Sequence, residues 1–252
     1  MADLNEWYNS VPQITRAWMT GSIVLPLLGR FGLLSTQYMF LSWDLFYTEF
    51  HIWRPLTALF FYPITPATGF NWLLMIYFMY NYSKACEKDV FTGRPADYLF
   101  MLLFFWITST MLAFAFGIYF LLEPMVLAVL YVWAQSNKET IVSFWFGTRF
   151  KAVYLPWVLL GFNMILRGGG LNEITGIIIG HLYYFSMVQY PQENGTEPFI
   201  STPEFLRRWL PDTTGGFSGF GVPPRAGAPQ AQQPNARPAQ HSWGVGRTLG
   251  SD

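Results

Sequence analysis

Gly176, Gly180 and His181 are the residues of this sequence whose types and spacing could do chemistry. They lie in an apolar run, 174–192, that contains no Asp, Glu, Lys or Arg. Glycines four residues apart share one face of a helix, where they let a second helix backbone approach closely. A histidine at the depth of a membrane helix is uncommon and needs a polar partner. A serine as that partner would give the nucleophile and base of an intramembrane protease, whereas its absence would leave a membrane scaffold.

The composition indicates which kind of protein positions these residues. The 252 residues are 52% hydrophobic and 19% aromatic, and only 12% are charged, against about 25% in an average soluble domain. These values predict a polytopic membrane protein. The formal net charge of zero gives no information about nucleic-acid binding, because the charges are segregated along the chain. We expect no nucleic-acid partner. The single cysteine, Cys86, excludes a disulfide within the chain.

Six apolar segments follow one another and predict six membrane-spanning helices in an all-α bundle. They cover residues 17–29, 69–82 with some residues before it, 98–122, 124–137, 152–166 and 174–192. Residues 84–94 are expected to form a short polar loop. The aromatic connection 31–54 is expected to lie among lipid headgroups, with Trp53 and Arg54 as interfacial anchors.

Several of these segments are shorter than the roughly 20 residues that usually cross a bilayer. Short spans thin the bilayer around them, and a thinned patch would lower the barrier to moving a polypeptide across. The alternative is that the helices tilt or extend beyond their apolar residues. Lys and Arg are concentrated on the side that holds the two chain ends, which predicts cytosolic termini.

The chain divides by composition into four parts. Residues 1–13 form a polar, interfacial N-terminal segment, and 14–190 form the six-span membrane domain. Within 191–212, the signal Thr202-Pro203-Glu204 predicts the start of a short interfacial helix. Residues 213–252 are rich in Gly, Pro, Gln and Ala and are expected to be a disordered cytosolic tail. Two small apolar islands in this tail, 217–221 and 241–250, suit linear motifs that dock on a folded partner.

Several stretches together resemble the derlins, the catalytically inactive branch of the rhomboid superfamily. The resemblance extends over almost the whole chain. It is carried by Trp53-Arg54, which is similar to the rhomboid first-loop motif, by Gly176 and Gly180, which are similar to the sixth-helix glycine motif, and by residues 93–98, 130–135, 141–150 and 241–250. The fold that it implies is a rhomboid-like bundle of six transmembrane helices.

The resemblance also implies a function and its partners. Derlins move misfolded proteins from the lumen or membrane of the endoplasmic reticulum to the cytosol for proteasomal degradation. The expected location is the endoplasmic reticulum membrane, in contact with membrane lipids. The expected partners are the misfolded substrates, a membrane ubiquitin ligase complex, further copies of the chain or other derlins, and the valosin-containing AAA ATPase. The tail residues that would bind this ATPase are Trp243, Gly244, Gly246 and Leu249. No cofactor and no metal are implied.

The competing function is an active rhomboid serine protease. That chemistry requires a serine in a Gly-x-Ser-Gly turn on the fourth span, activated by the sixth-helix histidine. Residues 124–137 contain one serine, Ser136, with no glycine beside it. A literal match, 216–219, falls in the tail, where no rigid element could hold it against His181. We therefore expect no catalytic residues, and His181 is interpreted as a buried polar residue that is hydrogen-bonded inside the bundle.

Two further patterns bear on this choice. Active rhomboids carry small residues after the histidine, whereas Tyr183, Tyr184 and Phe185 follow here. A small-molecule or ion transporter would place charged side chains in the middle of its spans, and the apolar segments contain none there. Both patterns favour the non-enzymatic interpretation.

Overall fold

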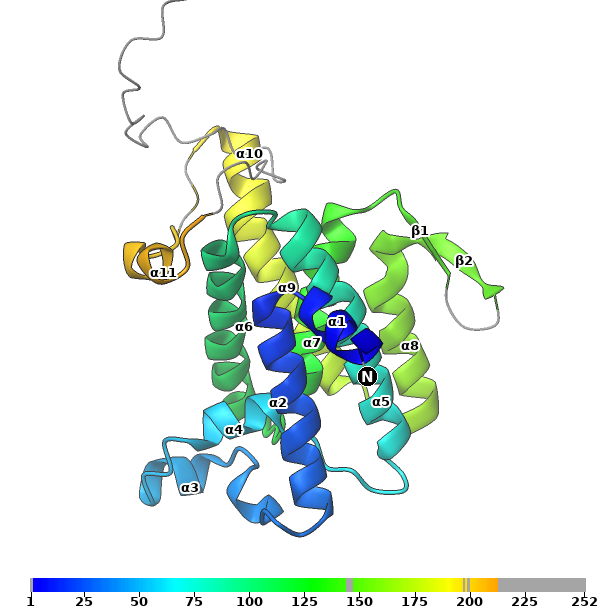
Figure 1. Ribbon diagram of the computed structural model, residues 1–252, viewed down its shortest axis with the longest axis vertical. Coiled ribbons are helices and arrows are strands. Elements are labelled where there is room, and N and C mark those ends of the chain that lie inside the picture. The colour runs from blue at the N-terminus through cyan, green and yellow to red at the C-terminus, as the bar shows by residue number, and fades with distance from the viewer. Residues whose placement is uncertain (1, 144–146, 197, 199, 213–252) are drawn as a thin grey trace, which may run out of the picture. The chain divides into compact units, whose positions relative to one another are not determined.

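The computed structural model describes residues 2–143, 147–196, 198 and 200–212, and most of these residues are helical (Figure 1). The chain divides into two units, Met1–Val222 and Pro223–Asp252. All described residues belong to the first unit. The predicted tail motif Trp243, Gly244, Gly246 and Leu249 lies outside the described residues, as does the match at 216–219.

Six longer helical stretches of the described chain coincide with the six apolar segments. They are α2 (Gln13–Arg30), α5 (Gly69–Phe78) with the π-helical turns η2 (Met79–Ser83) and η3 (Cys86–Val90), α6 (Pro95–Phe116), α7 (Leu122–Ser136), α8 (Leu155–Arg167), and α9 (Leu171–Tyr184) with η6 (Phe185–Gln189) and α10 (Tyr190–Asn194). The shorter elements are α1 (Ala2–Ser10), η1 (Thr36–Tyr38), α3 (Trp43–Thr48), α4 (Arg54–Phe60), η5 (Ala152–Tyr154) and α11 (Glu204–Trp209).

A helix continues through most of the segment that was predicted to be a polar loop, residues 84–94. It extends to Val90, and Glu87 has partners inside the fold. Glu87 accepts hydrogen bonds from the backbone N–H groups of Ile14 and Thr15, at 3.1 and 2.8 Å, and from the Thr15 hydroxyl at 2.7 Å. The carboxylate thereby satisfies donors at the start of α2 that a helix leaves free. The predicted loop is therefore wrong for 84–90.

The all-helical prediction also needs correction, because a β-hairpin joins α7 to α8. Strand β1 (Ile141–Ser143) pairs antiparallel with β2 (Arg149–Lys151), and Val142 lies opposite Phe150. A salt bridge of 2.7 Å between Lys151 Nζ and Glu139 extends the hairpin on its exposed side.

Helix α7 forms the centre of the bundle (Figure 1). Every residue from Leu122 to Val132 is buried. The helix packs most extensively against α9 and also contacts α4, α5, α6 and α8. Around it, the neighbouring helices turn large apolar side chains outward, among them Leu73, Tyr77, Ile107, Met111, Trp157 and Ile165.

The helices differ in length and in their capacity to cross a membrane. Of the described helices, only α6 is both long and apolar enough to do so by length and composition. Gly117 ends it in the left-handed conformation, at φ 69°, which glycine adopts without strain. With 15 residues, α7 is about 22 Å long, short of a hydrocarbon core of about 30 Å. The count of six membrane spans stays a prediction.

Candidate functional site

The two predicted glycines lie where α9 meets α7. A Cβ atom added to Gly176 would lie 2.6 Å from the carbonyl oxygen of Pro124, and one added to Gly180 would lie 3.0 Å from that of Ala128. These distances bring the two helix backbones into direct contact over one turn. Because the atoms that a Cβ would meet include backbone atoms of α7, a larger side chain on α9 could be accommodated only if the helices moved apart.

His181 follows Gly180 and therefore points about 100° away from the α7–α9 seam. Its side chain is exposed, so the prediction of a buried histidine is wrong. Its Nδ1 atom hydrogen-bonds with the hydroxyl of Tyr131 on α7 at 2.8 Å, and the two rings meet edge to face. The predicted hydrogen bond to the bundle is present, and it joins an exposed histidine to a buried tyrosine.

Tyr131 occupies the position on α7 that would have to carry a serine nucleophile. Ser136 lies more than one helical turn further along and donates its hydroxyl to the backbone oxygen of Val132 at 2.7 Å. The pair at this site is therefore a phenol and an imidazole. Tyr131 and His181 can exchange a hydrogen bond, but neither is the serine on which the protease reaction depends.

A buried polar cluster, which the sequence analysis missed, lies at one end of the bundle. The helices α5, α7 and α9 begin at this end, and α8 ends there. Asn71 donates to Glu123 Oε1 at 3.1 Å, and Asn172 donates to Glu123 Oε2 at 2.7 Å. Asn163 donates to Glu173 at 2.6 Å. Asn71 also contacts the hydroxyl of Tyr62 at 2.9 Å. Four helices are thus joined through amide–carboxyl pairs.

The electrostatics of helix ends explain why two acidic side chains can be buried together here. Glu123 and Glu173 are 1% and 3% exposed, and each lies in the first turn of its helix. The N-terminal end of a helix carries a partial positive charge and free N–H groups, which stabilise a negative charge. In the sequence, Glu123 falls between two of the predicted apolar segments, 98–122 and 124–137. The signal that could have predicted this cluster is the repeated occurrence of acidic and amide residues near the ends of the apolar segments that meet on one side of the bundle.

The first-loop motif separates into one exposed and one buried residue. Trp53 is 44% exposed, whereas Arg54 is 2% exposed. The guanidinium of Arg54 donates to the backbone oxygens of Gln37 and Phe40, at 2.8 and 2.9 Å, and to Nδ1 of His51 at 3.1 Å. Arg54 therefore holds the loop 31–53 together. Because its side chain is buried, the prediction that Arg54 is an interfacial anchor among lipid headgroups is wrong.

A second polar cluster fastens the C-terminal part of the described chain to α6. Asp97 accepts hydrogen bonds from Thr202 at 2.6 Å and from Arg207 of α11 at 3.2 Å, and it pairs with Arg94 at 3.3 Å. The predicted helix start is confirmed in position, since Pro203 precedes α11. Phe205 and Trp209 remain exposed on α11.

No group of three His, Cys, Asp or Glu side chains within the described residues is arranged to hold a metal ion. The features that the structure brings together are therefore a close helix seam, a pair formed by the buried Tyr131 and the exposed His181, a buried acid–amide cluster and a tied first loop.

Comparison with known proteins places these features in a family context. The model of the Der1-like family matches residues 11–204. Derlin-1 of Caenorhabditis elegans is 55% identical over 252 residues, which cover 99% of this chain and 100% of the relative. Derlin-1 of Homo sapiens is 51% identical over 250 residues, or 99% of each chain. Derlin-1 of Drosophila melanogaster is 42% identical over 248 residues, or 98% of this chain and 99% of the relative.

Proposed function

The chain belongs to the Der1-like family, and on that premise we propose that it moves misfolded proteins out of the endoplasmic reticulum for degradation. Proteins of the lumen or membrane would pass to the cytosol and then to the proteasome. The observation that carries this proposal is the similarity to proteins named Derlin-1 over nearly the whole chain. The proposal also fits the composition, which favours a membrane protein.

In the proposed topology, the six longer helices cross the endoplasmic reticulum membrane and both termini are cytosolic. The large apolar side chains that α5, α6 and α8 turn outward support contact with lipid, since a lipid-facing surface costs them no hydration. The acid–amide cluster then faces the lumenal end and the Asp97–Arg207 cluster the cytosolic end. Helix α8 has 13 residues and is about 20 Å long, so the bilayer beside it would be thinned.

The role is passage and recruitment rather than peptide cleavage. Tyr131 stands against His181 where a protease would need serine, and this supports a rhomboid-like protein without proteolytic activity. The tail residues Trp243, Gly244, Gly246 and Leu249 would recruit the valosin-containing AAA ATPase. A membrane ubiquitin ligase complex, further copies of the chain and other derlins are the proposed partners in the membrane.

A degradation chase tests this function. Turnover of a misfolded lumenal glycoprotein is followed in cells that lack the protein and in cells that re-express it. We expect slower turnover without the protein and restored turnover with either the wild type or His181→Ala. Equal turnover in all cells would contradict the proposed function, whereas rescue by the wild type but not by the folded His181→Ala variant would favour the protease.

A further inference from the structure

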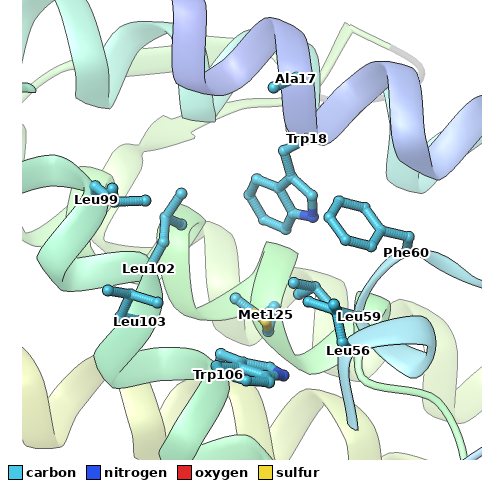
Figure 2. A pocket seen from close by; sticks show the side chains of 10 residues that line it. All are labelled: Ala17, Trp18, Leu56, Leu59, Phe60, Leu99, Leu102, Leu103, Trp106 and Met125. Atoms are coloured by element: carbon cyan, nitrogen blue, oxygen red, sulfur yellow. The ribbon is translucent and has the colours of Figure 1, made fainter. Parts of the chain in front are cut away.

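A pocket opens on the side of the bundle formed by α2, α4 and α6, with Met125 of α7 at its base (Figure 2). Its empty space, including the part open to the outside, is about 590 Å³. The side chains that line it are Ala17, Trp18, Leu56, Leu59, Phe60, Leu99, Leu102, Leu103, Trp106 and Met125. None carries a charge, and two indole N–H groups are the only side-chain hydrogen-bond donors among them.

The pocket has a buried floor and an exposed rim. Trp18, Leu102 and Met125 are 5%, 8% and 1% exposed and form the floor. Ala17 and Leu56 are exposed at the rim. The opening therefore lies on the outer surface of the bundle, beside the outward-facing residues of α6. In the membrane placement proposed above, on which the inference rests, lipid covers this opening.

One polar group of the lining lacks a partner. The indole Nε1 of Trp106 donates to the backbone oxygen of Pro55 at 2.9 Å. The Nε1 of Trp18 is buried and has no hydrogen-bond partner in the part of the chain that the structure describes. A buried donor without an acceptor is unfavourable. Phe60 lies beside this nitrogen in Figure 2, and both side chains line the pocket.

We propose that this pocket binds one acyl chain of a membrane glycerolipid. The ester carbonyl accepts the hydrogen bond of Trp18, and the hydrocarbon packs against Leu102, Met125 and Trp106. Trp18 lies five residues into α2, about 7.5 Å from its first residue. This places the indole near the cytosolic interface, where tryptophan side chains usually meet lipid headgroups.

The size and polarity of the pocket favour an acyl chain over a polypeptide. A helix is about 10 Å across, so 590 Å³ would hold fewer than two of its turns. A peptide segment would also bring one N–H and one C=O per residue into a site that offers a single free donor. An ester-linked acyl chain brings one carbonyl followed by hydrocarbon, which is what the lining can satisfy.

Photo-crosslinking in proteoliposomes tests the proposal. The full-length protein is reconstituted with a phosphatidylcholine that carries a diazirine midway along one acyl chain, and labelled residues are mapped by mass spectrometry. We expect label on Leu102 and Met125 of the wild type. Label confined to outward-facing residues such as Leu73 and Ile107 would overturn the proposal, because it would show surface lipid only.

Two variants sharpen the result. Leu103→Trp fills the pocket from its rim and should abolish the label on Met125, whereas Ile107→Trp adds the same bulk to an exposed site of α6 and should preserve it. Trp18→Phe keeps an aromatic side chain but removes the N–H donor. The wild type should label more strongly with an ester-linked probe than with the ether-linked analogue, and Trp18→Phe should lose this preference. An equal response of the two probes with wild-type protein would contradict the assigned hydrogen bond.

Other occupants give different outcomes. Displacement of the phospholipid label from Met125 by a sterol, or a crosslink from a reporter at Met125 to a second copy of the chain, would overturn the assignment to an acyl chain. Resistance of the protein to alkaline extraction reports its membrane placement separately. Extraction of the protein would contradict the proposed function. Resistance to extraction without label on the pocket floor would contradict only the acyl-chain proposal.

Discussion

The side-chain amide of Asn71 donates to Oε1 of Glu123 across 3.1 Å and so joins α5 to α7 inside the bundle. Asn172 donates to the other oxygen of the same carboxyl group and adds α9. One acidic side chain thus holds three helices at the end where all three begin. This relationship makes Glu123 a structural tie, because its loss removes an acceptor from the half-buried Asn172 and leaves the buried Asn71 amide with Tyr62.

Glu123→Ala should therefore destabilise the protein strongly. Each of the two hydrogen bonds that Glu123 accepts from these amides contributes about 0.5–3 kcal/mol, so their loss costs about 1–6 kcal/mol. Thermal unfolding in detergent micelles measures the change. Glu139→Ala is the matched control, because it removes an exposed partner of Lys151 whose contribution is about 0–1 kcal/mol. Equal melting temperatures for the two variants would refute the role of the cluster.

Gly176→Ala should separate α7 from α9. The new Cβ atom would meet the backbone oxygen of Pro124 at 2.6 Å, and overpacking of this kind costs about 1–3 kcal/mol. Gly161→Ala is the control within α8, where an added Cβ has open space; removing a helical glycine there should stabilise by about 0.5–1 kcal/mol. Export of a misfolded substrate should fall only with the first variant. A Gly176→Ala protein as stable as the wild type would show that the seam is looser than these distances indicate.

Arg54→Lys should loosen the first loop while keeping its charge. A lysine ammonium cannot reproduce the planar fork that bonds the carbonyls of Gln37 and Phe40. Each hydrogen bond to a charged group contributes about 1.5–3 kcal/mol. We expect faster proteolytic cleavage and faster hydrogen exchange within residues 36–53. Arg30→Lys, at an exposed position, should leave both unchanged, and a protected loop in Arg54→Lys would exclude the proposed tie.

Much of the fold could be predicted because long apolar runs and helices coincide. The positions of α2, α6, α7 and α9 follow from the charged residues that bound each uncharged segment. Residues 84–90 were misinterpreted because their charges suggested water, whereas Glu87 is used to cap α2, which is distant in sequence. Such non-local partners leave no periodic signal.

The candidate site was harder to predict than the helices. A run such as 174–192 is apolar on every side, so its sequence does not tell which face meets a neighbour. The two glycines indicated which face of the helix meets a neighbour. They did not indicate where His181 points, because the next residue of a helix is rotated by about 100° around the helix axis. The burial of Arg54 was missed for a related reason, since two of its three acceptors are main-chain oxygens, which any sequence would offer.

Lengthening α8 should shift the bilayer thickness that suits the protein. Helix α7 is enclosed, whereas α8 turns Trp157 and Ile165 outward, so a change of length on α8 is felt by lipid. Insertion of one turn of leucines after Val158 should move the most stabilising phosphatidylcholine from shorter to longer acyl chains, as measured by thermal unfolding. Gly161→Ala alters the same helix without lengthening it and should keep the original optimum. If the lengthened variant kept the same optimal acyl-chain length, bilayer thinning by α8 would not be part of the mechanism.

The tail motif gives a prediction that is independent of the bundle. Trp243→Ala combined with Leu249→Ala should abolish co-precipitation of the valosin-containing AAA ATPase, because the two side chains supply the apolar contacts of the motif. Resistance to alkaline extraction should be unchanged. Phe217→Ala with Phe220→Ala alters the other island and serves as the comparison. Loss of binding in that variant alone would move the ATPase site to 217–221.

The enclosure of α7 has a consequence for how the protein is made. During synthesis, Asn71 leaves the ribosome before Glu123. Asn172 leaves it only after Glu123, from which it is separated by 49 positions in the sequence. In the proposed topology, a newly made α7 is too short to be a strong insertion signal, and its carboxyl group still lacks one amide partner. We therefore expect the insertion of α7 to be completed only when α9 has been made. A nascent chain that stops after Ser136 should leave its fourth segment outside the bilayer, so biogenesis is cooperative between segments that are not adjacent in sequence.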